Sequence, residues 1–148
     1  VPLRHVKPHG ALYNMAAKDE KLARAIVEGI CEVDDHLILL ALSGSEMLLA
    51  AEKAGLRAAS EVFADRGYQP DGTLVPRSQP GAMITDETLA IERVVRMVTE
   101  GVVTAVDGTD IPLRADSICV HGDGEKALLF VRRIRAALEA KGVALRAL

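Results

Sequence analysis

The amino-acid sequence predicts an α/β fold built on a parallel sheet. Apolar runs typical of strands alternate along the chain with segments whose apolar residues recur at helical spacing. The run HLILLAL at 36–42 is continuously apolar, as in parallel strands that are buried on both faces. Because the crossovers of such sheets are right-handed, we expect the C-terminal ends of the strands to lie at the same edge.

Three strands and two helices are expected in the first half of the chain. Apolar residues at helical spacing indicate a helix over 19–33, and Ser43 is expected to cap a second helix that ends at Gly55. In chain order the expected elements are a strand at 2–6, a helix at 19–33, a strand at 36–42, a helix at 44–55 and a strand at 58–64.

The second half of the chain begins with a long segment rich in Gly and Pro, residues 65–84. A loop of this length in a compact domain is typically functional or disordered. A β-hairpin is expected around Asp107–Gly108, with Pro112 at an edge position. The other expected elements are a helix from Asp86 with Leu89, Val94, Val95 and Val98 on one face, a strand at 117–123, a helix from about 124 to 141, and 143–148, which is compatible with a final strand.

Composition narrows the class of protein. The 148 residues are 49% apolar and 26% charged, which is ordinary for one globular domain. A net charge of −3, only 3% aromatic residues and no basic run argue against nucleic acid as a partner. No apolar run is long enough to span a membrane, and no secretory signal is seen. Cys31 and Cys119 lie in apolar stretches without a CxxC pair, so a reduced, cytoplasmic protein is expected.

Polar side chains follow four of the expected strands. Ligands bind at this edge of parallel α/β sheets, and glycines allow the backbone to approach them closely. We therefore expect one site here, with His9 and His121 facing the same cavity. The segments that follow the strands are Lys7-Pro8-His9-Gly10, Ser43-Gly44, Asp65-Arg66-Gly67-Tyr68 after a strand that carries Glu61, and His121-Gly122-Asp123.

Each of these residues also has a structural interpretation. Asp65 and Arg66 could form a plain ion pair with Glu61 as a partly buried partner, and Lys7 and Arg77 could be solvated surface charges. Ser43 fits a helix cap better than a nucleophile, because no GxSxG motif surrounds it. His5 and His36 have no such context and are interpreted as structural or surface residues. The histidines and carboxylates could hold a divalent metal, but HxH and HExxH spacings are absent, as are the Walker A and GxGxxG motifs.

Four blocks together resemble the LamB/YcsF family, in the order that the family has them, over residues 6–123. The resemblance implies a seven-stranded parallel β/α barrel of the glycoside hydrolase/deacetylase type, with the hairpin as an insertion. Family members carry a substantial portion before the KPHG block, so 1–148 is expected to be one domain, the C-terminal portion of that barrel. The blocks are VKPHGALYN, EVFADRGY, DGTLVPRSQPGAMI and SICVHGD.

The resemblance also implies a function, that of the A subunit of bacterial ATP-dependent 5-oxoprolinase. Such an enzyme opens the lactam of 5-oxoproline to L-glutamate and hydrolyses ATP, in company with separate subunits B and C. ATP would bind through the complex, and a divalent metal is left open. In this chemistry His9 and His121 transfer protons or polarise the carbonyl, Asp65 and Asp123 orient water or a histidine, and Glu61 belongs to the catalytic group. The implied substrate-binding residues are Lys7, Asn14, Arg66, Tyr68 and Arg77.

Two other functions remain alternatives. One is a metal-dependent amidohydrolase or deacetylase that does not use ATP, and the other is a non-catalytic scaffold made of part of a barrel. An open sheet also exposes unpaired backbone at its edges. We therefore expect either self-association into a homo-oligomer or an exposed apolar patch beside the first strand.

Overall fold

The computed structural model describes residues 2–121 and 126–148, and Asp123 therefore lies outside the described residues. The chain divides into two compact units, Val1–Glu61 with Leu148 and Val62–Ala147. Each unit is described by itself. Whether 1–148 behaves as one domain stays a prediction.

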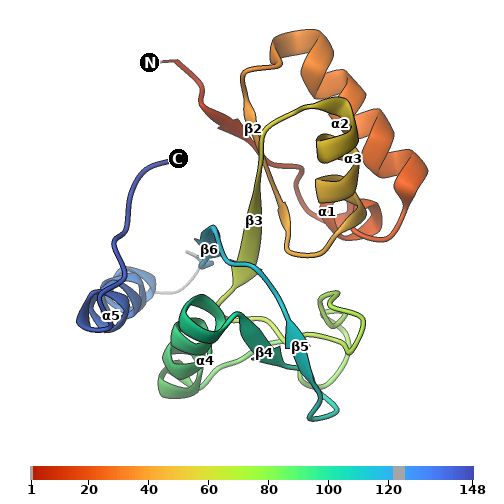
Figure 1. Cartoon of the computed structure of the whole chain (residues 1–148). Helices are drawn as coiled ribbons and strands as arrows, with labels where there is room; N and C mark the ends of the chain where they lie inside the picture. Colours follow the sequence, from red (N-terminus) through yellow and green to blue (C-terminus); the bar gives the residue numbers. More distant parts are fainter. Residues whose placement is uncertain (1, 122–125) are drawn as a thin grey trace. The chain divides into compact units, whose positions relative to one another are not determined.

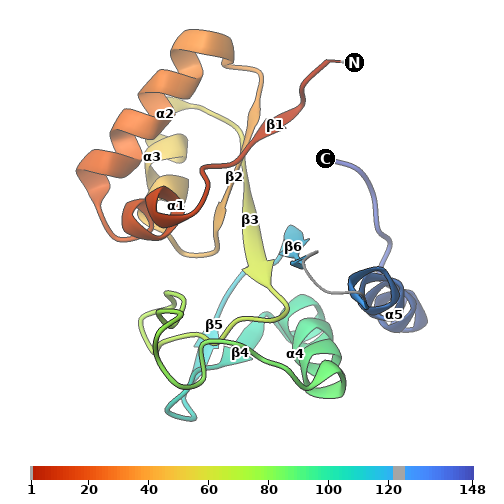
Figure 2. The ribbon, with the colours of Figure 1, turned by 180° about the vertical axis from the view of Figure 1, so that it is seen from behind.

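The first unit holds the parallel strands that the sequence predicts (Figure 1). Strands β1 and β2 pair in parallel with His5 opposite Ile38, and β2 and β3 pair in parallel from Leu39 opposite Ala58 to Leu42 opposite Glu61. Helices α2 and α3 lie side by side on one side of these strands, as both views show (Figure 2). The elements of this unit are β1 (His5–Val6), α1 (Ala11–Ala16), α2 (Glu20–Asp34), β2 (Ile38–Leu42), α3 (Glu46–Ala54) and β3 (Ala58–Phe63).

Burial in β2 confirms the interpretation of the apolar run. All five of its residues are buried, as expected of a parallel strand covered on both faces. Its residues Ile38 and Leu40 form an apolar cluster with Ala59 of β3. The two strands that pair with β2 are β1, which Lys7 follows, and β3, which carries Glu61.

The sequence predicts the start of α2 correctly, but not the residue that caps α3. Asp19 accepts a hydrogen bond from the Leu22 amide at 3.0 Å and begins α2. Val33, in the last turn of α2, is 83% exposed. The expectation that Ser43 caps α3 is wrong, since Ser45 is the N-cap residue and Gly44 turns the chain between strand and helix.

The second unit contains the hairpin and the two C-terminal helices. Val102 pairs with Pro112 and Thr104 with Asp110 in antiparallel register, which confirms the predicted hairpin. Asp86 caps α4 by accepting hydrogen bonds from the amides of the second and third residues of the helix. The elements of this unit are α4 (Glu87–Glu100), β4 (Val102–Thr104), β5 (Asp110–Pro112), β6 (Ser117–Cys119) and α5 (Ala127–Ala140).

Several boundaries in the second unit differ from the expectation. The expectation of a final strand at 143–148 is wrong, because these residues form no regular structure. Leu89 is 46% exposed and does not belong to the buried face of α4. The buried face of α4 contributes Val94, which packs with Ala64 and, from α5, Ile134 and Leu138.

The parallel sheet has the order β1-β2-β3-β6. Strand β3 begins in the first unit and ends in the second, where the Ala64 amide donates to the Cys119 carbonyl at 3.1 Å. Four strands, with two parallel pairs, form a mixed α/β structure consistent with part of a barrel. Seven strands and the glycoside hydrolase/deacetylase class stay predictions.

Two surface properties bear on partners. Leu3, two residues before β1, is 81% exposed. Self-association through such apolar surface stays a prediction. Among the described helices, none is both long and apolar enough to cross a membrane.

Candidate active site

A buried carboxylate at the end of β3 organises the first group of candidate residues. Glu61 is 2% exposed. Its Oε2 and Oε1 atoms lie 2.9 Å and 3.2 Å from Nζ of Lys7, and the hydroxyl of Tyr13 donates to Oε1 at 2.9 Å. We call Lys7, Tyr13 and Glu61 the Glu61 cluster. Glu61 is thus the partner of Lys7 rather than of Asp65 and Arg66, and the cluster adds Tyr13, which the sequence analysis did not single out.

The turn at Gly10 brings Lys7 and Tyr13 to the same carboxylate. Gly10 has a φ of 63°, a left-handed conformation that a residue with a side chain rarely adopts. The side-chain amide of Asn14 donates to the Gly10 carbonyl at 3.2 Å and ties this turn to α1. Asn14 is exposed, and so is His9, which therefore lies within reach of a ligand.

A histidine and an aspartate meet in the second unit. Nδ1 of His121, which follows β6, lies 2.7 Å and 2.9 Å from the two carboxylate oxygens of Asp65, which follows β3. Nη2 of Arg77, from the long loop, lies 3.3 Å from Nε2 of His121. The ring of Phe63 lies beside the imidazole, with 6.0 Å between the ring centroids. We call Asp65, Arg77 and His121 the His121 cluster.

These contacts define the tautomer of His121. A guanidinium can only donate hydrogen bonds, so Nε2 must accept from Arg77. In the matching tautomer the Nδ1–H group donates a hydrogen bond to Asp65, and the lone pair lies on Nε2, the atom from which a general base acts.

Arg66 and Tyr68 hold the long loop. Arg66 is 4% exposed, and its Nε and Nη2 donate to the carbonyls of Ala82 at 3.0 Å and Val75 at 2.6 Å. Tyr68 is buried, and its hydroxyl accepts from the amide of Phe63 at 2.9 Å. The structure thus shows a role for both side chains in positioning the loop, and their binding of substrate stays a prediction.

A second arginine, Arg93 of α4, supports the same loop and was not singled out from the sequence. Both its terminal nitrogens donate to the Arg66 carbonyl at 3.2 Å. Burial lowers the pKa of Arg93, while the pKa of Arg66 is lowered first by burial and then by the positive charge of Arg77. A single arginine at a helical position carries no sequence signal that would have revealed this contact.

The structure therefore brings together some predicted residues and separates others. Asp65 pairs with His121, and within the described residues it forms no ion pair with Arg66. His9 and His121 belong to different units, so their shared cavity stays a prediction. The role expected of Asp123 also stays a prediction, because Asp123 lies outside the described residues.

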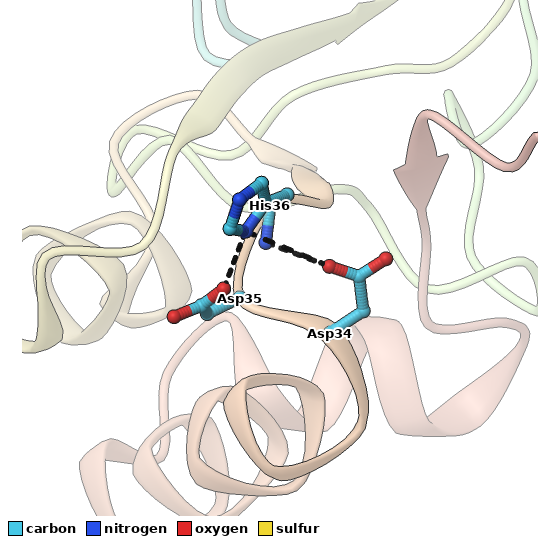
Figure 3. Close-up of side chains that lie close together, drawn as sticks. All are labelled: Asp34, Asp35 and His36. Carbon is cyan, nitrogen blue, oxygen red and sulfur yellow. Dashed lines mark hydrogen bonds and ion pairs between the residues drawn. The ribbon is translucent and has the colours of Figure 1, made fainter.

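Within the described part of the chain, three potential metal ligands group at one place, the exposed turn between α2 and β2 (Figure 3). Asp34 accepts from the backbone amide of His36 at 2.9 Å, and Nδ1 of His36 lies 2.5 Å from Oδ1 of Asp35. The hydrogen bond and charge of Asp35 raise the pKa of His36. All three residues are exposed, in agreement with the interpretation of His36 as a surface residue.

Two pairs, lysine with glutamate and histidine with aspartate, follow strands of a parallel sheet. This arrangement defines the class of protein as α/β, with polar side chains at or near the C-terminal ends of its parallel strands, the edge at which α/β proteins commonly bind ligands. The chain belongs to the LamB/YcsF family, whose model matches residues 1–148.

Relatives with assigned names agree with this membership. The chain is 61% identical to the 5-oxoprolinase A subunit of Clostridium beijerinckii and 56% identical to that of Pyrococcus abyssi; each match covers 97% of this chain and 56% of the relative. The crystal structure of the lactam utilization protein from Thermus thermophilus is similar with a TM-score of 0.88 and 46% identity, over 100% of this chain and 59% of that one. The chain thus spans little more than half the length of these relatives.

Proposed function

We propose that this chain is part of the A subunit of a 5-oxoprolinase, which opens the lactam of 5-oxoproline to L-glutamate with hydrolysis of ATP. The observation that carries the proposal is the 61% identity to the 5-oxoprolinase A subunit of Clostridium beijerinckii over 97% of the chain. In the reaction, water adds its oxygen to the lactam carbonyl carbon, the carbon–nitrogen bond breaks, and the ring nitrogen leaves as the amine of glutamate. A second water is consumed as the bond between the β- and γ-phosphates of ATP breaks, which yields ADP and phosphate.

His121 is the group that we assign to water activation. In the tautomer with its proton on Nδ1, the imidazole has a lone pair on Nε2, and Asp65 would stabilise the imidazolium that forms when Nε2 takes a proton. Arg77 donates to Nε2 in this structure. An incoming carboxylate or phosphoryl group competes for the guanidinium, because an anion is a better acceptor than a neutral imidazole. Substrate binding would thereby free Nε2.

His9 and Lys7 are assigned to the substrate carbonyl and its charge. His9 is exposed beside a lysine whose side chain is 31% exposed. An amide carbonyl is a poor electrophile and needs polarisation or phosphorylation before water attacks it. His9 would supply a hydrogen bond or proton, and Lys7 would hold the developing negative charge. Asp123 remains a proposed partner for the water.

ATP and further subunits complete the proposal. The chain has no standard phosphate-binding motif. ATP use would therefore depend on the complex with subunits B and C. Both cysteines are free thiols, which fits the cytoplasm as the proposed location. A divalent metal accompanying ATP would be bound through the nucleotide phosphates, as is common for Mg²⁺.

Reconstitution tests the proposal. The gene product that carries this sequence is purified alone and with subunits B and C, and glutamate and ADP are measured with 5-oxoproline and ATP. We expect both products only when all subunits and both substrates are present. Lactam opening by the purified chain alone, or none with every component present, would contradict the proposal. Turnover that needs no ATP and ends on chelation would instead support a metal-dependent amidohydrolase.

Two observations on the reconstituted complex separate an enzyme from a scaffold. His121→Ala is compared with the unmodified protein for assembly and for turnover. A scaffold would assemble and retain full turnover in this variant. An enzyme of the proposed kind would assemble but lose most of its turnover.

A further inference from the structure

One carboxylate binds the segment around His9 from both sides. Lys7 stands two residues before His9 and Tyr13 four residues after it, and both donate to the carboxylate of Glu61. We infer that Glu61 and Tyr13 are positioning residues, which fix the turn that carries His9. This inference rests on the proposed function and changes the expected role of Glu61 from contact with the substrate to support of the residues that contact it.

Burial separates the supporting groups from those that can reach a ligand. The Glu61 side chain is 3% exposed and Tyr13 is 4% exposed, whereas Lys7 is partly exposed and His9 is exposed. Both oxygens of Glu61 are engaged by donors of its own chain. With its side chain buried and both oxygens held by donors, Glu61 has little access to a ligand in the site. We therefore place its effect on the substrate in the side chains that it holds.

The backbone explains why two contacts are needed. Gly10 reverses the chain with a positive φ, and α1 begins directly after it. Because α1 has only six residues, its own hydrogen bonds stabilise it weakly. The Tyr13 hydroxyl anchors this short helix to β3, and the Lys7 ammonium anchors the end of β1 to the same group. His9 lies on the turn between the two anchors.

The charge of Glu61 makes these anchors strong. Hydrogen bonds in which one partner is ionised are roughly twice as strong as neutral ones. Lys7 is half-buried and donates to both oxygens, so its flexible side chain is held near one conformation. Tyr13 is a neutral donor, and its hydroxyl adds a further hydrogen bond to the same carboxylate without adding charge. Removal of either donor leaves the carboxylate buried and partly unsatisfied.

Hydrogen exchange measured by mass spectrometry tests the anchoring without relying on the reaction. The variants are Tyr13→Phe and Glu61→Gln in the full-length gene product, with Glu28→Gln as a matched control on the exposed face of α2. We expect backbone exchange over 7–14 to rise about 5- to 100-fold in both variants, from the loss of buried hydrogen bonds, with exchange over 38–54 unchanged. Glu28→Gln is expected to change neither.

Activity of the reconstituted complex supplies the second measurement. Tyr13→Phe is expected to lower kcat more than it raises KM, because a misplaced His9 affects the transition state more than substrate binding. Unchanged exchange over 7–14 would overturn the inference, as would a uniform rise across 2–61, which would show a general loss of stability. A complex that has no activity even when unmodified would contradict the proposed function, while the exchange result would still decide the anchoring.

Discussion

Asp65 and His121 stand 56 residues apart in the chain and are joined by hydrogen bonds of 2.7 Å and 2.9 Å. Asp65 follows β3 and His121 follows β6, the two strands that neighbour each other in the sheet. The pair is therefore a product of sheet order, and it sets the tautomer of the imidazole. Because a carboxylate only accepts hydrogen bonds, the pair favours the tautomer with the proton on Nδ1 and the lone pair on Nε2, beside Arg77.

We predict that Asp65→Asn lowers turnover of the reconstituted complex by roughly two to four orders of magnitude. The amide can donate to Nδ1, and this would place the imidazole proton on Nε2, where it blocks proton acceptance. Steady-state kinetics measure the effect. Asp116→Asn, an exposed aspartate paired with Arg114, is the control and should leave turnover unchanged. Equal turnover in both variants would remove Asp65 from the mechanism.

Gly67 and Gly29 should respond in opposite ways to alanine. A Cβ atom on Gly67 would lie 2.0 Å from the carbonyl oxygen of Gly81, so the loop backbone would have to move. Gly29 lies inside α2 with no atom within 4 Å of the added Cβ. We expect Gly67→Ala to lower the free energy of unfolding by about 1–3 kcal/mol or more. Gly29→Ala should raise it by about 0.5–1 kcal/mol.

Urea unfolding of both glycine variants measures these changes. The comparison is informative because the substitution is chemically identical in the two cases. An unchanged free energy of unfolding in Gly67→Ala would contradict the close approach of Gly67 to the Gly81 carbonyl. Loss of stability at Gly29 would show that its face of α2 is covered.

Arg66→Lys should loosen the long loop. A lysine cannot donate at once to the carbonyls of Val75 and Ala82, as the guanidinium does. We expect a loss of about 2–3 kcal/mol, typical of buried hydrogen bonds to a charged group. Thermal unfolding and the rate of tryptic cleavage after Arg77 report it. Arg135→Lys on exposed α5 is the control, and equal cleavage rates in the two variants would contradict the prediction.

Local features of the fold could be predicted from the sequence. The buried strand β2 follows from its continuous apolar run, and the hairpin from Asp107–Gly108, because each depends on residues that are adjacent in the chain. Asp86 was identified as the start of α4 for the same reason. The short helix α1 was not identified, since six residues are too few to show a helical period.

Candidate residues could be found from the sequence, but their partners could not. Lys7, Asp65 and His121 were selected because they follow expected strands. Their contacts depend on the order of the strands in the sheet and on how far each side chain reaches in the fold. The sequence alone does not show either. Arg66 shows the difficulty, because a residue next to Asp65 was expected to act with it and instead donates to the loop carbonyls.

The imidazole of His36 should titrate above its ordinary pKa of 6.5, because of Asp35. Since folding raises this pKa, the pair contributes stability below the unfolded value, and this contribution is lost as the pH rises through the folded value. An NMR titration of the His36 ring measures the shift. Asp35→Asn should return the pKa toward 6.5, and Asp34→Asn should change it less, because Asp34 acts on the ring only through its charge. Equal effects would contradict the assignment.

His9 is the exposed histidine that the Glu61 cluster holds beside Lys7. If it polarises the lactam carbonyl or transfers a proton, His9→Ala should lower turnover of the reconstituted complex by roughly two to four orders of magnitude, the usual size of an acid–base contribution. His9→Gln should retain part of the turnover if a neutral hydrogen bond suffices, and none of it if a proton must move. His5→Ala, an exposed histidine in β1, is the control. Turnover unchanged by His9→Ala would exclude His9 from the reaction and leave the Glu61 cluster with a structural role alone.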